Sequence, residues 1–166
     1  GGGFTAIQQA LDAAADGDTV QLVDGTYSGE GNVSLFFHGR SLTLCSLNGP
    51  AQCIVDCGGI RLVDGPMGTI RGITVANCQQ MSIYTDDFTL EDCVFRGSGQ
   101  FKQSLLDIRY CRPTIANCTF QDCTGDDGGV VVCWGARPTI RGCAFENNPA
   151  SLDAGAILKD RKSTRL

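Results

Sequence analysis

The sequence predicts an all-β fold, a parallel β-helix in which short strands coil into stacked rungs. An eight-residue phrase at 113–120 returns 25 residues later at 138–145, and copies precede it at 88–95 and, in degenerate form, at 68–75. A fixed short period indicates one supersecondary unit stacked on itself. An apolar residue also stands seven positions before the Ile or Leu of each phrase. These pairs are Phe37 and Leu44, Val63 and Ile70, Ile83 and Leu90, Ile108 and Ile115, and Cys133 and Ile140.

The opening segment predicts the single helix of the chain, over residues 4–15. Phe4, Ile7, Leu11 and Ala14 form one apolar stripe at helical spacing. Residues 5–8, Thr-Ala-Ile-Gln, have the pattern of a capping box. A turn at 16–18, a strand at 19–23 and a turn at 24–25 follow. We expect this helix to cover the open apolar end of the solenoid, where a terminal repeat would expose its core.

Each rung is expected to contain three short strands, as near 81–84, 88–91 and 93–96. The Ile, Cys and Phe of one phrase cannot share a face of a straight strand, because side chains alternate with a period of two. One residue must therefore turn the chain, and it must tolerate a left-handed conformation. The expected bend residues are Gly72, Asp92, Asn117 and Gly142. Five rungs follow, and a sixth begins at 156–158.

The repeat also predicts ladders of like residues inside the coil. These ladders are Cys93, Cys118 and Cys143, and Phe95, Phe120 and Phe145. We interpret the cysteine ladder as buried packing, since parallel stacked strands hold Cβ atoms near the strand spacing of about 4.8 Å and a disulfide needs about 3.8 Å. One or two disulfides stay open among the cysteines outside this ladder, Cys45, Cys53, Cys57, Cys78, Cys111 and Cys123.

An outward column on the first strand of each rung is the candidate binding surface. If Ile83, Ile108 and Cys133 point inward, then Tyr84, Arg109 and Trp134 point outward in register. Flat aromatic faces beside an arginine suit a sugar ring or a uronate carboxylate. The competing interpretation is a cation–π stack that joins the rungs beneath covering loops. A second outward column contains Ser82, Asp107 and Val132.

Catalytic and metal-binding patterns are sparse. Asp107 beside Arg109 is the one outward acid and base pair, whereas Asp86, Asp87, Asp126 and Asp127 fall in turns. A glycosidase needs two converging carboxyl groups, and the column gives Asp107 only Ser82 and Val132 as neighbours. No cysteine and histidine spacing matches a zinc site, and His38 is the single histidine. We therefore expect no cofactor, with calcium as the one metal left open.

The quoted repeats resemble those of the right-handed parallel β-helix superfamily, the pectin-lyase-like fold. Within it, residues 116–120, 145–148 and 155–157 are similar to repeats of polymorphic outer-membrane and related cell-surface proteins, as is the opening segment 4–27. The resemblance covers about residues 4–159. Their Gly-Gly-Ala-Ile signature is altered at 154–157 and 128–131. The superfamily includes lyases, hydrolases, adhesins and passive stalks. Its enzymes place clustered carboxylates, often with calcium, on the face where Tyr84, Arg109 and Trp134 are expected.

Together these observations predict one β-helix domain over residues 1–159, a fragment of a longer chain. Residues 160–166 break the repeat and match the translation of a sequencing adapter, so we treat them as a non-native tail. The net charge of −5 argues against nucleic acid as a partner, and no stretch predicts a membrane span. We expect an extracellular or cell-surface scaffold that is adhesive or contacts a polysaccharide or cell-surface glycan. A polysaccharide lyase or glycoside hydrolase, and a purely structural stalk, are the alternatives.

Overall fold

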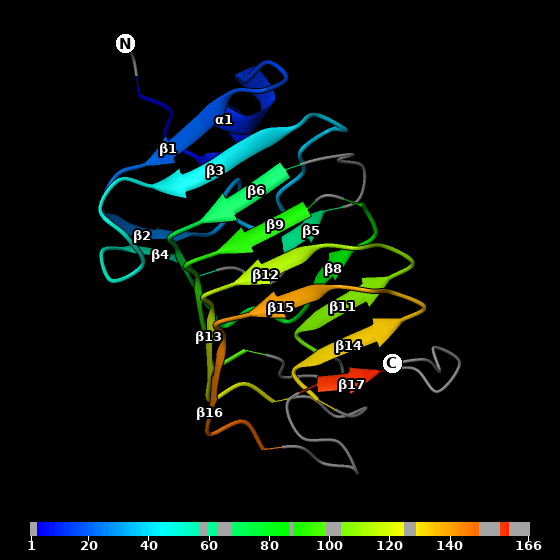
Figure 1. Ribbon diagram of the computed structural model, residues 1–166. Coiled ribbons are helices and arrows are strands. Elements are labelled where there is room, and N and C mark those ends of the chain that lie inside the picture. The colour runs from blue at the N-terminus through cyan, green and yellow to red at the C-terminus, as the bar shows by residue number, and fades with distance from the viewer. Residues whose placement is uncertain are drawn as a thin grey trace.

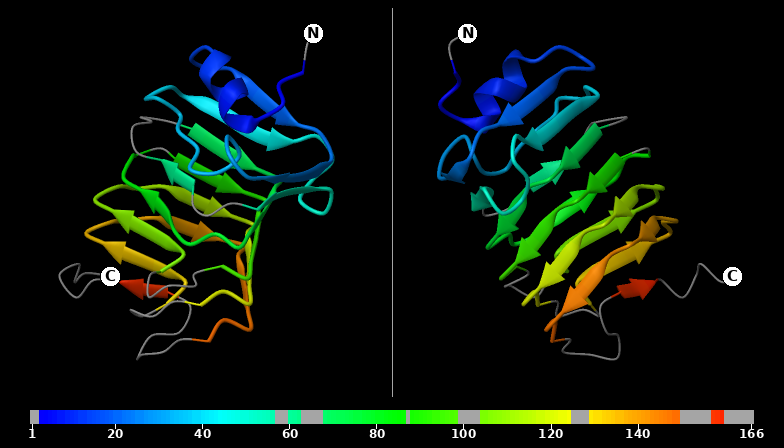
Figure 2. Two further views of the ribbon diagram at one scale, coloured as in Figure 1. Left: turned by 180° about the vertical axis from the view of Figure 1, so that it is seen from behind. Right: turned by 60° about the vertical axis from the view of Figure 1, so that its left-hand side comes forward.

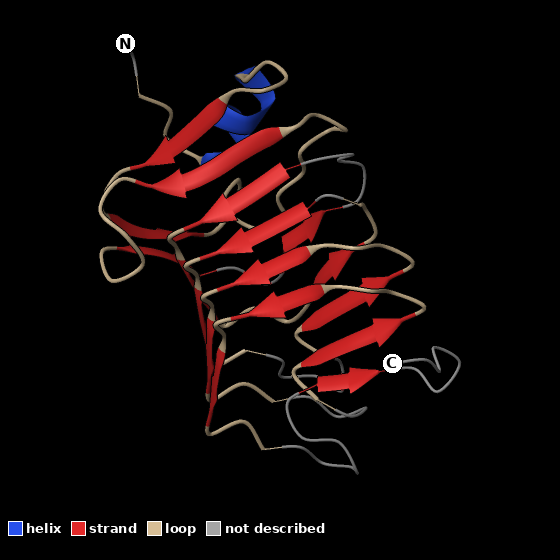
Figure 3. Ribbon diagram, in the orientation of Figure 1, coloured by secondary structure: helices blue, strands red, loops and turns tan. Residues whose placement is uncertain are grey.

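The computed structural model describes residues 3–56, 60–62, 68–86, 88–98, 104–124, 129–149 and 157–159. The chain in these ranges is mostly β, with one short N-terminal helix and three parallel sheets that wind into a solenoid (Figures 1 and 3). The expected positions Cys57, Val63, Asp87, Asp126 and Asp127 and the tail 160–166 lie outside the described residues.

Each coil gives one strand to sheet A and one to sheet B, and each coil after the first also gives one to sheet C, so sequence neighbours lie in different sheets. Sheet A contains β1 (Thr19–Leu22), β3 (Leu42–Ser46), β6 (Gly68–Arg71), β9 (Phe88–Glu91), β12 (Thr114–Ala116) and β15 (Thr139–Arg141). Sheet B contains β2 (Gly25–Ser28), β4 (Cys53–Asp56), β7 (Thr74–Ala76), β10 (Val94–Arg96), β13 (Thr119–Gln121) and β16 (Ala144–Glu146). Sheet C contains β5 (Ile60–Leu62), β8 (Met81–Ile83), β11 (Leu106–Arg109), β14 (Val131–Trp134) and β17 (Ile157–Lys159). Figure 2 shows the three stacks from two further sides.

The register between coils follows the sequence repeat. Ile115 pairs with Leu90 on one side and with Ile140 on the other. In sheet C, Ile108 pairs with Ile83 and Cys133 in the same way. The fold class is therefore confirmed: three short strands per coil, parallel stacking and one helix at the N-terminal end.

Like residues stack on like in the core. The rings of Phe95 and Phe120 have centroids 5.1 Å apart at an interplanar angle of 9°, and those of Phe120 and Phe145 are 4.8 Å apart at 10°. Phe95 and Phe120 are fully buried, and Phe145 is partly exposed at the end of the stack. Such an aromatic column adds a geometric preference to the area that it buries.

Left-handed residues turn the chain at the corners. Gly72, Asp92, Asn117 and Gly142 lie between sheets A and B with φ of 65°, 53°, 53° and 62°. A second column follows sheet B and was not anticipated from the sequence: Asn77, Gly97, Asp122 and Asn147, with φ of 53°, 58°, 52° and 51°. A third follows sheet C, where Tyr110 and Gly135 have φ of 56° and 58°. Each corner thus uses mainly the residue types that tolerate this conformation.

The corner between sheets A and B is also tied by side chains. The Asn117 amide donates to the Asp92 carboxylate at 3.2 Å. A Cβ atom added at Gly142 would lie only 2.5 Å from Asn117 Oδ1, so the next rung needs glycine for space as well as for its positive φ. The Asn117 side chain therefore fixes the residue type one rung above.

The observed helix is shorter than the predicted one over residues 4–15, and the prediction of a capping box is wrong. The helix α1 spans Ile7–Ala13, and no side chain within the expected box caps it. The Ile7 amide instead donates to Asn32 Oδ1 at 2.9 Å, and the Gln8 amide donates to the carbonyl of Gly31 at 2.8 Å. Ile7 and Leu11 are buried against the coil, whereas Phe4 is exposed. The loop before β3 therefore supplies the cap that the local sequence was expected to supply.

We predict that replacing Asn117 with alanine lowers the free energy of unfolding by about 1–3 kcal/mol. Alanine tolerates the left-handed region less well than asparagine does, and the substitution also removes the hydrogen bond to Asp92. Asn117→Gly keeps the backbone conformation accessible and should cost less than the alanine variant. Urea denaturation of both variants measures the difference, and equal losses would contradict the role given to the bend.

Candidate functional site

The outward residues at the ends of the sheet C strands form the candidate site. Arg109 pairs in register with Trp134, and Tyr84 follows Ile83, the partner of Ile108. Tyr84 and Trp134 are 44% and 40% exposed. The Arg109 guanidinium carbon lies 6.0 Å from the centroid of the Tyr84 ring. Strand pairing thus brings the three predicted residues into one column with aromatic rings on either side of a cation.

Asp107 holds the Arg109 guanidinium in place. Arg109 Nε donates to both carboxylate oxygens at 2.9 and 3.0 Å, and Nη2 donates to Oδ2 at 2.7 Å. The Asp107 side chain is 6% exposed, whereas the Arg109 side chain is 45% exposed. The hydrogen bonds from Arg109 to Asp107 raise the pKa of the guanidinium above its ordinary value. The ion pair therefore has a buried anion and a surface cation, and this geometry fixes the arginine between the two rings.

The column of Ser82, Asp107 and Val132 differs from the expected outward surface. Ser82 and Val132 pair in register on either side of Asp107. All three residues are buried, at 8%, 4% and 2% exposure. Tyr84, Arg109 and Trp134, which the competing interpretation placed beneath covering loops, instead keep access to solvent.

This arrangement does not assemble an acid and base pair around Asp107. Its carboxylate already accepts three hydrogen bonds from Arg109. Its register neighbours are a hydroxyl and an isopropyl group rather than a second carboxyl group. Two-carboxylate glycoside hydrolysis requires converging acids. In the described part of sheet C, the register neighbours of Asp107 therefore do not supply the second carboxyl group that a glycosidase needs.

Tyr110 extends the aromatic surface and was not singled out from the sequence. It is 82% exposed, directly follows Arg109, and has φ of 56°. A bulky residue is uncommon in this conformation. A Cβ atom added at Gly135 would lie 2.9 Å from Tyr110 Cδ1, so the missing side chain at Gly135 makes room for the ring. The sequence signal that could have found Tyr110 is Gly135, which directly follows Trp134 and lies one 25-residue period after Tyr110.

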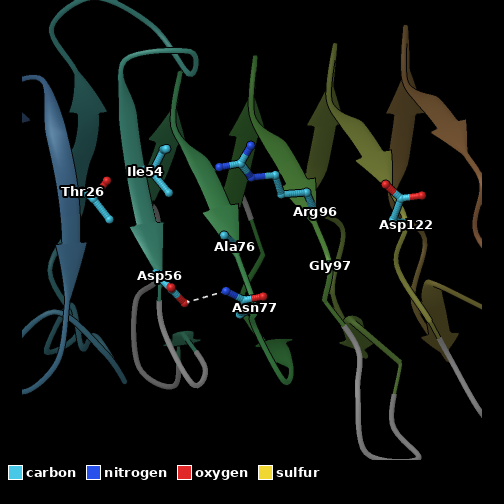
Figure 4. Close-up of a pocket in the computed structure, with 8 residues that line it drawn as sticks. All are labelled: Thr26, Ile54, Asp56, Ala76, Asn77, Arg96, Gly97 and Asp122. Carbon is cyan, nitrogen blue, oxygen red and sulfur yellow. Dashed lines mark hydrogen bonds between the residues drawn. The ribbon is translucent and has the colours of Figure 1, made fainter.

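A shallow groove of about 380 Å³ lies on the outer side of sheet B (Figure 4). Its lining residues are Thr26, Ile54, Asp56, Ala76, Asn77, Arg96, Gly97 and Asp122. Asn77 donates to Asp56 at 3.1 Å, the dashed contact in the figure. None of the lining residues is aromatic. The groove is therefore the weaker candidate for a flat sugar ring, and it provides a comparison surface for the site on sheet C.

The cysteine ladder packs in the core. Cys93 Sγ lies 3.3 Å from the carbonyl oxygen of Glu91, and Cys118 Sγ lies at the same distance from that of Ala116. Cys93 and Cys118 are buried and Cys143 is partly buried, all three as free thiols. Cys45, Cys53, Cys111 and Cys123 are also free thiols. Burial raises the pKa of Cys53 and of Cys111 to about 11.

His38 belongs to the attachment of the helix rather than to a metal centre. Its Nε2 atom lies 2.9 Å from Asp12 Oδ1, and Gln8 donates to the same oxygen at 2.7 Å. The hydrogen bond from Gln8 makes the largest contribution to lowering the pKa of Asp12, and the one with His38 lowers it further. Throughout the described ranges, no three His, Cys, Asp or Glu side chains gather into a potential metal site. The helix of the described chain is too short to cross a membrane.

Comparison with known proteins agrees with this geometry at the level of the fold. A family model described as "Right handed beta helix region" matches residues 58–165. The chain therefore belongs to the right-handed β-helix family. No curated protein and no solved structure gave a significant match.

We predict that the folded protein loses stability as the pH rises from about 9 to about 11. Cys53 and Cys111 ionise near pH 11 when folded, against an ordinary thiol pKa of 9.0. A raised pKa means that the folded state keeps the proton longer, so its stabilisation is complete below pH 9 and is lost as the pH rises through 11. Denaturant midpoints across this range, under reducing conditions, provide the measurement.

The variant that tests the pH prediction is Cys111→Ala, which removes one of the two thiols whose pKa is raised to about 11. Its stability should fall less steeply over the same pH range than that of the wild type. An identical slope would show that ionisation of Cys111 does not contribute.

Proposed function

We propose that this β-helix is a scaffold that binds carbohydrate through the aromatic platform formed by Tyr84, Arg109, Trp134 and Tyr110. The observation that supports this proposal is the register of sheet C, which places an immobilised arginine beside exposed aromatic rings. Tyr and Trp offer flat apolar faces with a polar edge, which suit the mixed surface of a sugar ring. The arginine supplies donors at a fixed position between them.

The rigidity of the platform favours recognition. All four of its residues lie on or next to paired strands, and Arg109 is held by three hydrogen bonds. Side chains with locked positions lose little conformational entropy when a ligand binds. Successive rungs are about 4.8 Å apart, and Tyr84 and Trp134 are two rungs apart, so a sugar chain along the solenoid axis would contact both.

The cellular setting is part of the same proposal. The acidic charge of −5 and the ten cysteines fit a secreted or surface protein, although the ladder cysteines Cys93, Cys118 and Cys143 are free thiols. The repeats at 116–120 and 145–148 resemble those of polymorphic outer-membrane and related surface proteins. An adhesive, glycan-contacting role outside the cell is consistent with both features.

We predict that a bound oligosaccharide shifts the fluorescence of Trp134, the single tryptophan of the chain. A sugar stacked on the indole removes water from its exposed face. Trp134→Ala should weaken binding about tenfold or more, since loss of a buried aromatic anchor commonly costs 2 kcal/mol or more. Calorimetry measures the affinity of this variant, which lacks the fluorescent reporter.

Phe36→Ala is the matched control for Trp134→Ala. Phe36 is an aromatic residue of nearly equal exposure, 41% against 40%, and it lies in the loop that contacts the helix rather than on sheet C. Its substitution should leave the affinity unchanged. Arg96→Ala tests the groove on sheet B instead, and a loss there with wild-type affinity for Trp134→Ala would overturn the assignment of the platform.

Tyr110→Gly should separate binding from stability. The left-handed conformation disfavours tyrosine by about 1 kcal/mol, but glycine adopts it freely and adds entropy to the unfolded chain. The free energy of unfolding should therefore stay unchanged or rise by up to about 1 kcal/mol, while sugar affinity falls. Denaturation and calorimetry on the same variant provide the two readouts. Unchanged sugar affinity would show that Tyr110 does not belong to the platform. A lower free energy of unfolding would contradict the strain assigned to its backbone conformation.

A further inference from the structure

The cation at the centre of the platform is already neutralised. Arg109 makes three hydrogen bonds to Asp107, and its guanidinium carbon lies 6.0 Å from the centroid of the Tyr84 ring. The Arg109 nitrogens bind the Asp107 oxygens directly at 2.7–3.0 Å, so no water layer separates the two charges. Opposite unit charges in direct contact largely cancel each other's field at a distance, although the guanidinium itself stays 45% exposed. The pair therefore presents little net charge to a ligand.

The geometry of the guanidinium also limits how it can bind. Nε and Nη2, the two nitrogens of one edge of the fork, both point to Asp107. Asp107 thus takes the edge through which an arginine can pair with a carboxylate side-on. The outer N–H groups, those of Nη1 and the second one of Nη2, are not used by Asp107 and can donate to a ligand. Hydroxyl and carbonyl oxygens accept from these groups without bringing a second anion to the ion pair.

We propose that the platform selects uncharged sugar residues over uronates. This inference rests on the proposed carbohydrate-binding function and specifies its ligand class. A uronate over Arg109 would bring a second carboxylate to a guanidinium that Asp107 already occupies, and like charges disfavour each other at short range. The acidic chain, with a net charge of −5, adds a long-range repulsion of polyuronates that salt would screen. A neutral sugar ring stacks on Tyr84 and Trp134 and accepts a hydrogen bond from Arg109 Nη1. It meets neither the short-range repulsion by Asp107 nor the long-range repulsion by the acidic chain.

The test compares an oligogalacturonate with the same oligosaccharide after full methyl esterification. The two probes share a backbone and differ in charge, and Trp134 fluorescence reports both titrations. At low salt, the ester should bind about tenfold or more tightly than the acid, because charge-assisted contacts set differences of this size. Added salt should narrow the gap by improving binding of the acid alone. Cellohexaose, a neutral chain of another backbone, completes the panel.

Asp107→Asn should reverse the preference. The neutral amide leaves Arg109 with its full charge. The ratio of the affinity for the acid to the affinity for the ester should therefore rise at least about tenfold relative to the wild type. Asp86→Asn is the matched control, since it removes the same unit of charge from a turn carboxylate that accepts from the Arg112 amide and makes no bond to Arg109. It should leave the preference as in wild type.

The outcomes separate the two proposals. Tighter binding of the acid than of the ester to the wild-type protein at low salt would overturn the selection of neutral sugars and leave the carbohydrate platform intact. Fluorescence that responds to none of the three probes would overturn the carbohydrate platform itself. If Asp107→Asn fails to fold, the comparison of acid and ester on the wild type, with its salt dependence, still decides the selection.

Discussion

Backbone hydrogen bonds between successive coils are the constraint on which the rest of the structure depends. At the repeated phrase, the amides of Asn117, Thr119 and Ala144 donate to the coil above or below at 2.9 Å. A parallel ladder of this kind is satisfied only if each coil returns to the same register. Insertions are therefore confined to the segments between strands, and the bend residues must recur at a fixed place. The 25-residue spacing of the repeated phrase follows from this requirement for a constant register.

Fixed register turns each inward position into a column, and the column decides which side chains fit. Phe120 stacks between two other phenylalanines at near-parallel angles, because rings that differ in size would leave gaps between rungs. Cys118 is small enough for its column, and its sulfur lies near the backbone oxygen of Ala116. A buried thiol of this type behaves as a small apolar side chain. The most repetitive residues of the chain are thus explained by packing.

The sequence allowed prediction of what depends on the repeat, and it failed where a distant segment intervenes. Asn117 and Gly142 could be assigned to the bend because period, parity and residue type agree on the same positions. The helix cap could not, since Asn32 reaches the Ile7 amide from a loop 25 residues away. The burial of Asp107 could not be predicted from its place in a column either. The alternation of side chains along a strand gives the direction of a side chain and not what covers it. Tyr110 was missed since its bend follows sheet C, where Gly135 is the one further left-handed copy within the described part of the chain.

The same constraint explains why function should be sought where a column is chemically mixed. Identical outward residues need no explanation beyond stacking, but Tyr84, Arg109 and Trp134 share a column without sharing a size or a charge. A lone arginine between two aromatic rings would be free to change rotamer, yet Asp107, two residues earlier on the same strand, fixes it at the cost of burying a carboxylate. Exposed ion pairs add little stability, so stability alone does not account for that cost. The proposed binding role does account for it, since a donor held at one position between two flat faces would distinguish one ligand from another.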